Sequence, residues 1–196
     1  MPLVNTYQVI DIKKMVHAKT KERIEAILDY AEDEMRRGGY DAVSFRDIAK
    51  AVDIKSSSVH YHFPQKSDLG QAVIDRYGDK FLNTLGDPNA IPDVQIGIQK
   101  LGGAYLESLK QTNSVCLACM LGSESPSLPD DLKPHVQTFF EKIVGWTEIV
   151  LKNKKGSPLE ATFVIGALQG SMALAVSQDN PAILEAAITQ LNSIAE

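Results

Sequence analysis

The chain has 196 residues and a formal net charge of -5; 44% of its residues are hydrophobic and 23% are charged. This composition excludes a disordered chain and a globally basic nucleic-acid coat. Two cysteines do not make a disulfide framework, and no uncharged apolar stretch reaches the ~20 residues needed to span a bilayer. We therefore expect a cytoplasmic protein with no membrane partner.

Charge is distributed unevenly along the chain. Residues 1–66 contain 11 Lys and Arg against 10 Asp and Glu, a net charge of +1. The remainder contains 9 against 15, a net charge of -6. The asymmetry suggests that the two parts have different partners.

In chain order, residues 1–17 form an extension whose structure the sequence does not predict. Its basic residues suit either a DNA-contacting arm or a solvated tail; they are Lys13, Lys14 and His17, followed by Lys19 and Lys21. Apolar residues then recur at helical spacing between residues 24 and 35, and Gly38-Gly39 ends this helix.

Two short helices joined by a tight turn are predicted at residues 44–51 and 55–62. Ser44 precedes Phe45-Arg46-Asp47, a pattern typical of a helix start, since the hydroxyl can accept from a free backbone N–H. A further helix begins near Lys66 and runs to about residue 85. The spacing is that of a helix-turn-helix, whose second helix enters the major groove of DNA; a plain helical corner is the alternative.

The rest of the chain also has helical spacing. Prolines, glycines and amphipathic patterns divide it into helices at residues 92–109, 114–124, 130–152, 158–177 and 181–195. No segment shows strand alternation, so we predict an all-α fold of about nine helices.

The candidate DNA-binding residues cluster on and around the second short helix. Small hydroxyl side chains at its start allow a close approach to base edges, and a lysine there can meet phosphate or guanine. Aromatic and basic residues at its end suit contacts with the sugar-phosphate backbone. The set comprises Ser44, Arg46, Lys55, Ser56, Ser57, Ser58, His60, Tyr61, His62 and Lys66.

The pattern becomes specific in two runs, SFRDIAKAVDI at residues 44–54 and SVHYHFPQKSDL at residues 58–69. With the preceding helix and its glycine turn, they resemble the N-terminal domain of TetR-family transcriptional repressors over about residues 18–80. The resemblance implies an all-α homodimer that binds double-stranded operator DNA and releases it when a small-molecule effector binds. It implies a DNA-binding domain at residues 18–66 and an effector-binding and dimerisation domain at residues 67–196.

The same resemblance gives roles to single residues. Ser44 and Lys66 match positions that contact phosphate, and Tyr61 and His62 match backbone-binding positions. Asp53 stands where the family usually has glycine, and aspartate tolerates a left-handed backbone better than most residues. The chain also departs from the pattern at Lys55, Ser57 and His60, which leaves the operator sequence open.

The middle helices are expected to enclose the effector pocket. Its candidate lining residues are large and mostly aromatic, which suggests an apolar or aromatic effector, although at helical spacing each also suits a core position. They are Tyr77, Phe81, Tyr105, Leu109, Cys116, Met120, Phe140, Trp146 and Phe163.

The last two predicted helices carry apolar and small residues. They form either an internal hairpin or, as the resemblance to TetR-family proteins implies, the interface between two copies of the chain. The candidate interface residues are Gly166, Gly170, Leu174, Leu184, Ile188 and Leu191.

Cys116 and Cys119 lie three residues apart on one helical face. No second Cys/His pair completes a zinc site, and we expect neither a metal nor a cofactor. The two thiols are buried apolar residues, unreactive pocket residues, or sensors that oxidants or electrophiles modify. The stretch Cys-Leu-x-x-x-Leu-x-x-Glu from Cys116 to Glu124 resembles the NemR-like subgroup of the family, which includes repressors of electrophile and quinone detoxification genes. That resemblance implies that Cys116 is a sensor.

Two other classes of protein compete with a DNA-binding regulator. A thiol oxidoreductase would use Cys116 and Cys119, but the chain lacks a βαβ context and any clear base or cofactor loop, so we do not expect an enzyme. A helical interaction protein would carry a helix-turn-helix that is only structural. Binding to the DNA that flanks the gene separates these classes from a regulator.

Overall fold

Helices account for nearly all the regular structure of the chain. The computed structural model describes residues 6–152 and 159–195, with the backbone alone over residues 6–17. Within these residues there are nine α-helices and no strand, which confirms the predicted all-α fold. The elements are α1 (Thr6–Gly38), η1 (Tyr40–Ala42), α2 (Phe45–Ala51), α3 (Ser56–His62), α4 (Lys66–Leu85), η2 (Pro88–Ala90), α5 (Val94–Thr112), α6 (Leu117–Ser123), α7 (Lys133–Lys152), α8 (Ala161–Ser177) and α9 (Ala182–Ile194), where η denotes a single 3-10 turn.

Side-chain caps fix several helix starts. The Ser44 hydroxyl accepts from the backbone N–H of Asp47 at 3.1 Å, which confirms the predicted start of α2. Asp68 accepts from the backbone N–H of Gln65 at 2.8 Å and completes a capping box at the start of α4. Asp93 caps α5 by accepting from the N–H of Ile96 at 2.7 Å. These local bonds explain why the starts of the first two lie where the sequence predicts them.

The first helix is longer than predicted. It begins at Thr6, so its backbone extends through most of the segment that the sequence left without a structure. The side chains of Lys13, Lys14 and His17 lie outside the described residues, whereas Lys19 and Lys21 are exposed on α1.

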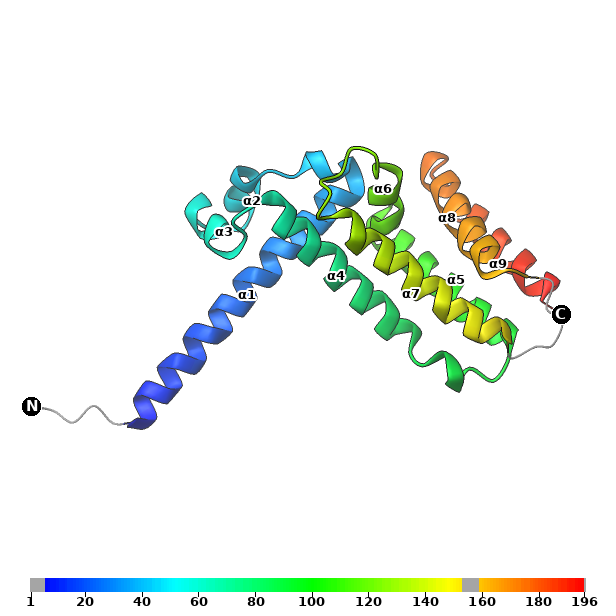
Figure 1. The fold of residues 1–196 in the computed structure, drawn as a ribbon, viewed down its shortest axis with the longest axis horizontal. Coiled ribbons are helices and arrows are strands. Elements are labelled where there is room, and N and C mark those ends of the chain that lie inside the picture. Colours follow the sequence, from blue (N-terminus) through cyan, green and yellow to red (C-terminus); the bar gives the residue numbers. More distant parts are fainter. Residues whose placement is uncertain (1–5, 153–158, 196) are drawn as a thin grey trace, which may run out of the picture.

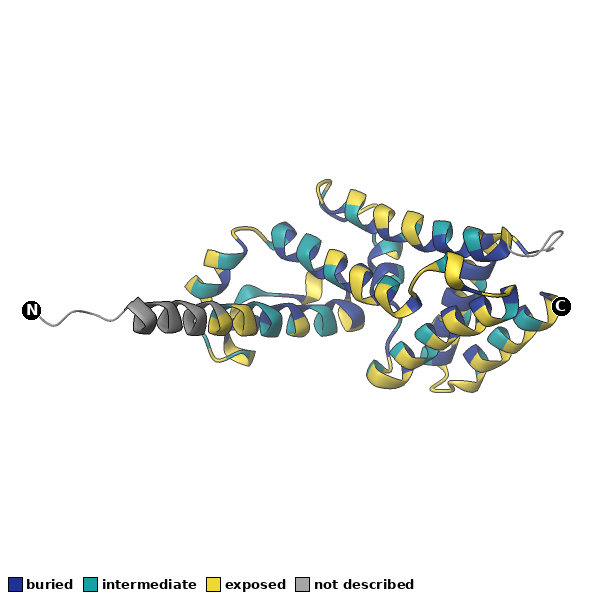
Figure 2. Ribbon diagram, turned by 90° about the horizontal axis from the view of Figure 1, so that it is seen from below, coloured by how far each residue is buried: buried dark blue, intermediate teal, exposed yellow. Residues whose placement is uncertain are grey.

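Figure 1 shows α2 and α3 at one end of the molecule, with α8 and α9 toward the other. The helices α4, α5 and α7 lie between these ends; α4 packs against α1 and α7, and α5 packs against α9. Buried residues line the faces that the helices turn to one another (Figure 2) and form one continuous core. No described helix combines the length and apolar character that crossing a lipid bilayer requires.

Candidate nucleic-acid interface and effector pocket

A tight turn sets the angle between α2 and α3. Asp53 has a φ of 54° in the left-handed region, and Ile54 donates its N–H to the Ala49 carbonyl at 2.9 Å. Aspartate adopts this backbone more readily than most residues, so glycine is not needed there. The turn expected at residues 52–54 is therefore confirmed.

One face of α3 is fixed in the core and the other is left free. Val59 is fully buried, and Phe63 is buried immediately after the helix. Helical periodicity then turns the remaining residues outward. Ser56, Ser57, His60 and Tyr61 are exposed, and Ser58 and His62 are half-buried.

Ring contacts orient the aromatic residues of α3. The His60 ring packs edge-on against Phe45 of α2, with 4.6 Å between ring centroids. Among the described aromatic rings, Tyr61 contacts only the neighbouring His62, and its side chain is 81% exposed. A large aromatic residue that is so exposed has no packing role in the folded subunit, so its place on α3 favours recognition of a partner.

Two of the candidate phosphate-binding residues already have partners. The Ser44 hydroxyl donates to the Asp47 carboxylate while it caps α2. Lys66 lies 3.4 Å from an Asp41 carboxylate oxygen and 4.5 Å from the centre of the Tyr40 ring. A phosphate would have to replace or join these partners. Arg46 and Lys55, by contrast, are exposed and form no ion pair with any described residue.

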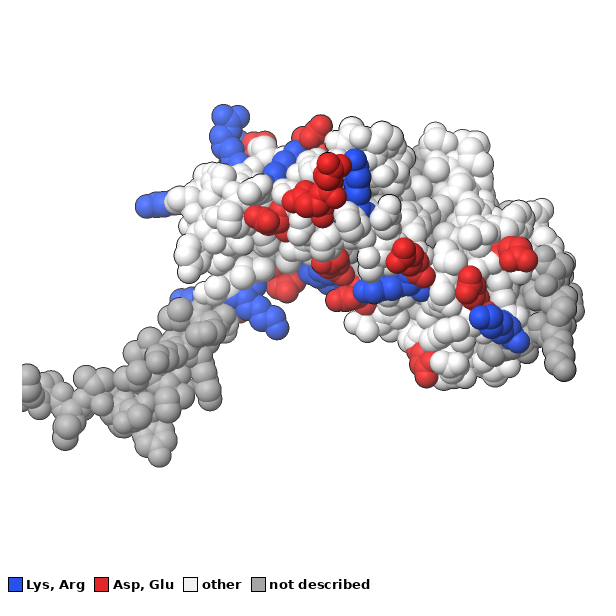
Figure 3. All heavy atoms as spheres, in the orientation of Figure 1, with Lys and Arg blue, Asp and Glu red and all other residues white. Residues whose placement is uncertain are grey.

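Basic side chains project at the α2–α3 end of the molecule. Figure 3 shows them at the upper left, with acidic side chains set back toward the middle. Arg46, Lys50 and Lys55 are exposed here, together with Asp47 and Asp53. The charge balance at this end is only slightly positive, so the local arrangement matters more than the net charge.

Ion pairs join α1 to α4. Arg76 of α4 lies 2.9 Å from Glu25, 2.8 Å from Asp29 and 2.9 Å from Glu32, all on α1, and its side chain is only 12% exposed. Burial alone would lower the pKa of Arg76, but these carboxylates outweigh it and raise the pKa. These ion pairs therefore tie α4 to α1.

A second connection joins the end of α1 to α6. Glu124 accepts from the backbone N–H of Tyr40 at 2.8 Å. Gly39 has a φ of 79°, and a Cβ at this position would overlap the Glu124 carboxylate. Glycine is therefore required by both the backbone conformation and the close contact. Sequence reasoning did not assign Glu124 this role, because the contact joins residues 84 positions apart.

Cys116, Leu117 and Leu121, which belong to the same quoted stretch as Glu124, are all fully buried. The Tyr77 hydroxyl donates to the Cys116 sulfur at 3.3 Å. Burial raises the pKa of the Cys116 thiol although Tyr77 opposes the shift, and burial also raises the pKa of Cys119. In this conformation the packing accounts for the whole stretch without a reactive thiolate.

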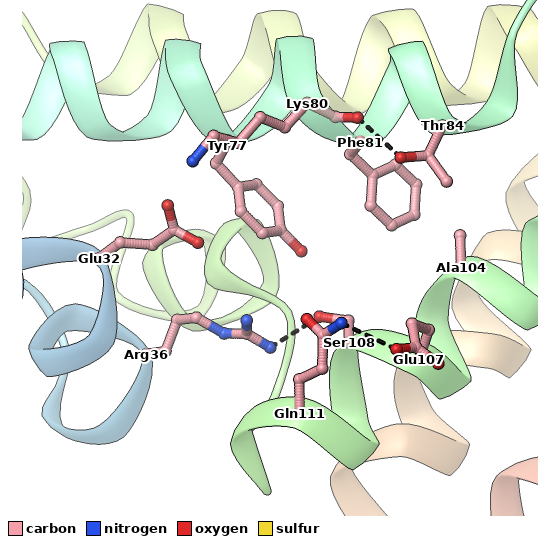
Figure 4. A pocket seen from close by; sticks show the side chains of 10 residues that line it. All are labelled: Glu32, Arg36, Tyr77, Lys80, Phe81, Thr84, Ala104, Glu107, Ser108 and Gln111. Atoms are coloured by element: carbon pink, nitrogen blue, oxygen red, sulfur yellow. Dashed lines mark hydrogen bonds between the residues drawn. The ribbon is translucent and has the colours of Figure 1, made fainter. Parts of the chain in front are cut away.

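A cavity of about 210 Å³ lies between α1, α4 and α5. Figure 4 shows Tyr77 and Phe81 reaching into it from α4, with Arg36 entering from α1 and Ser108 from α5. Its lining residues are Glu32, Arg36, Tyr77, Lys80, Phe81, Thr84, Ala104, Glu107, Ser108 and Gln111. This wall mixes charged, polar and aromatic side chains, whereas the sequence suggested a mainly apolar one.

Only two of the nine predicted pocket residues, Tyr77 and Phe81, line this cavity. Trp146 is buried and donates from its indole nitrogen to the Gly86 carbonyl at 2.8 Å, which is a structural contact. Phe163 is 56% exposed on α8, so its assignment to a pocket within the subunit is wrong. Like Trp146, five further predicted residues are buried or half-buried but do not border the cavity. They are Tyr105, Leu109, Cys116, Met120 and Phe140.

Among the described residues, none covers one apolar face of α8. Phe163 and Leu174 are 56% and 53% exposed, and a Cβ built on Gly166 or Gly170 meets nothing within 4 Å. These four residues share one face by helical spacing, and α8 contains no charged residue. Ile194 of α9 is also 47% exposed.

The predicted interface residues on α9 lie inside the subunit. Leu184 and Leu191 are buried, and Ile188 packs close to Gly102 of α5. The burial of Leu184 and Leu191 leaves them no surface for the expected contact with a partner, whereas Ile188 is only half-buried and its contact stays a prediction. Gly166, Gly170 and Leu174 on α8 remain available.

Comparison with known proteins supports the helix-turn-helix. Residues 27–73 match the sequence description of "Bacterial regulatory proteins, tetR family". A TetR transcriptional regulator from Legionella pneumophila, known from its crystal structure, is 32% identical; the match covers 100% of both chains with a TM-score of 0.80. The chain belongs to the TetR family.

Two further relatives place this TetR-family protein among known regulators. The HTH-type transcriptional repressor ComR of Escherichia coli (strain K12) is 37% identical over 57 residues, which span 29% of this chain and 27% of ComR. The reduced form of E. coli NemR is 17% identical, with 89% of this chain and 97% of that chain covered and a TM-score of 0.72. The likeness to NemR concerns the fold alone.

Proposed function

We propose that this TetR-family protein is a cytoplasmic, DNA-binding transcriptional repressor that reads its operator with α3. The observation that carries the proposal is the free face of α3. Val59 holds the helix in the core, while Ser57, His60 and Tyr61 point away from it at the end of the molecule. A helix that is presented in this way suits the major groove.

Each side chain of this face has a task in the proposed complex. Ser56 and Ser57 meet base edges, where a hydroxyl can donate or accept. Lys55 and Arg46 contact phosphate, and Tyr61 packs against the sugar-phosphate backbone. Phe45 packs against the His60 ring and fixes its orientation. Because the His60 ring is already ordered, it loses little conformational entropy when it enters the groove.

Titration of fluorescent duplexes with the full chain tests this proposal. The duplexes carry the DNA flanking the gene or a scrambled sequence of the same length, and anisotropy reports binding. We expect nanomolar-range, salt-sensitive affinity for the flanking DNA, roughly 10³-fold tighter than for the scrambled duplex. Equal affinity for both duplexes at all salt concentrations would contradict a sequence-reading α3.

We also propose that two copies of the chain pair through α8. The support is the uncovered apolar face of Phe163, Gly166, Gly170 and Leu174, whose glycines allow two helices to approach closely. A two-fold dimer would present two copies of α3, as operator half-sites ~35 Å apart require.

Light scattering after size exclusion tests the pairing. Leu174→Glu should convert dimers to monomers, because a charge would be buried against its own copy. Ile96→Glu is the matched control, since Ile96 is a similarly exposed apolar residue, at 42%, on a different helix, α5. A dimeric Leu174→Glu variant would exclude α8 from the interface.

Release of DNA is proposed to follow effector binding in the cavity between α1, α4 and α5. Modification of Cys116, as in the NemR-like subgroup, is a second route. One observation favours it: Cys116 contacts Tyr77, which forms part of the cavity wall. An adduct at Cys116 would displace Tyr77, but only after an opening motion exposes the buried sulfur.

A further inference from the structure

Arg36 is an unusual residue in the wall of the cavity. Only 4% of it is exposed, yet among the described residues no carboxylate oxygen lies within 4 Å of its guanidinium. Its neighbour Arg37, by contrast, pairs with Asp33 at 2.7 Å on the surface of α1. The guanidinium carbon lies 5.9 Å from the centre of the Tyr77 ring, so an aromatic face and neutral oxygens surround this charge instead of a carboxylate.

Neutral oxygens satisfy only part of this guanidinium. Nε donates to the Val115 carbonyl at 3.0 Å, and Nη2 donates to the Ser108 hydroxyl at 2.8 Å and to the Ser114 carbonyl at 3.4 Å. Nη1 donates to none of the described residues. A planar, bidentate acceptor at the edge formed by Nη1 and Nη2 would therefore take the Nη1 donor and replace the bond from Nη2 to Ser108.

The acidic residues around the cavity are already occupied or lie at its rim. Glu32 accepts from Arg76 at 2.9 Å, and Glu107 is exposed and accepts from the Gln111 amide at 2.8 Å. Lys80 stands at the rim and pairs only loosely with Asp29 at 3.7 Å. Arg36 is thus the deepest charge that an entering molecule meets.

Aromatic side chains define the rest of the ligand. Tyr77 and Phe81 stack 6.1 Å apart between centroids, and both border the cavity. At about 210 Å³ the cavity is smaller than the roughly 300–1,000 Å³ typical of sites for drug-sized ligands. The molecule that fits is small and pairs one anionic group with a flat apolar part.

We propose that the cavity binds a small aromatic or aliphatic monocarboxylate, whose carboxylate pairs with Arg36 while its apolar part lies against Tyr77 and Phe81. The carboxylate replaces the hydrogen bond from Nη2 to Ser108. Arg36 also holds the chain between α5 and α6, and α6 holds Tyr40 through Glu124. A carboxylate bound to Arg36 is therefore connected, through these hydrogen bonds, to the end of α1 that leads into the helix-turn-helix.

The consequence for DNA rests on the proposed repressor function, but the binding itself can be measured without DNA. Isothermal titration calorimetry of the full chain would compare sodium benzoate, phenylacetate and hexanoate with the neutral benzamide. At least one carboxylate should bind at least about tenfold more tightly than benzamide, as a charge-assisted bidentate pair requires. If all three carboxylates fail to bind, or bind no better than benzamide, the proposal is overturned.

Arg36→Gln and Arg37→Gln form the matched pair of variants. Carboxylate affinity should fall at least about tenfold in the first and stay unchanged in the second. Arg36→Lys keeps the charge but loses the planar fork, so it serves if Arg36→Gln does not fold; it should bind more weakly than the parent with the preference for carboxylates reduced. Unchanged binding in a folded Arg36 variant would mean that this residue only ties α1 to the chain before α6.

The two proposals fail in different ways. Carboxylate binding without any affinity for the flanking DNA would leave the Arg36 site intact and refute the repressor function. Specific DNA binding without carboxylate binding would refute the Arg36 site alone.

Discussion

The contact between Gly39 and Glu124 links the DNA-binding helices to α6, and Gly39→Ala tests it. Gly39 has φ 79° and ψ -175°, a conformation that is essentially restricted to glycine, so alanine costs about 1–3 kcal/mol in backbone strain. The new Cβ also displaces the Glu124 carboxylate from the N–H of Tyr40. Loss of a hydrogen bond to a charged acceptor costs about 1.5–3 kcal/mol more.

We therefore expect Gly39→Ala to lower the free energy of unfolding by roughly 2.5–6 kcal/mol, a large part of the 5–15 kcal/mol that stabilises a typical protein. In a Glu124→Ala background only the strain remains, so the same change should cost about 1–3 kcal/mol. The coupling between the two positions is then about 1.5–3 kcal/mol.

Urea denaturation at one fixed protein concentration measures all four corners of this cycle. Gly103→Ala is the control, because a Cβ at this exposed position of α5 meets nothing; it should stabilise the protein by about 0.5–1 kcal/mol. Additive effects of Gly39→Ala and Glu124→Ala would refute the contact, and a cost below about 1 kcal/mol for Gly39→Ala would refute the strain.

Three further predictions concern Arg76 and the cysteines. Arg76→Met should destabilise the protein by about 2 kcal/mol or more in urea denaturation, because it leaves Glu25 and Glu32 without their partner. The exposed Arg37→Met should cost less than about 0.5 kcal/mol, and equal costs would contradict the α1–α4 contact. Iodoacetamide near neutral pH should label the half-buried Cys119 well before the buried Cys116, as peptide mass mapping can show, and the reverse order would mean that Cys116 is open in solution. Because burial raises the pKa of Cys116, its contribution to stability is complete below the pKa of the unfolded thiol and is lost as the pH rises through the higher folded value. Unfolding free energy should therefore fall between about pH 8 and 10, less steeply in Cys116→Ala, and parallel slopes would contradict this.

Local interactions made the helix-turn-helix predictable from the sequence. Ser44 caps α2 through a residue three positions away, and Asp53 forms the turn through its own backbone preference. The apolar positions Ile48 and Val59 are fully buried, as helical spacing requires. Such short-range rules need no knowledge of the rest of the fold.

Long-range contacts were not predictable in the same way. Arg36 looks like one of two equivalent arginines at the end of a helix, and only the fold buries it against a chain segment 79 positions away. The stripe of Leu184, Ile188 and Leu191 marks α9 as amphipathic, but periodicity cannot say whether α5 or a second copy covers it. Phe163 shows the opposite error, since an aromatic residue was placed in a pocket although α8 leaves it exposed.

The central claim is that the exposed face of α3 reads DNA, and Tyr61→Ala tests it most directly. Tyr61 is 81% exposed, so the variant should unfold at the same urea concentration as the parent. We predict that its affinity for the flanking DNA, measured by anisotropy, falls at least about tenfold, whereas Ile96→Ala on α5 binds like the parent. A folded Tyr61→Ala protein that binds the flanking DNA as tightly as the parent would contradict the account.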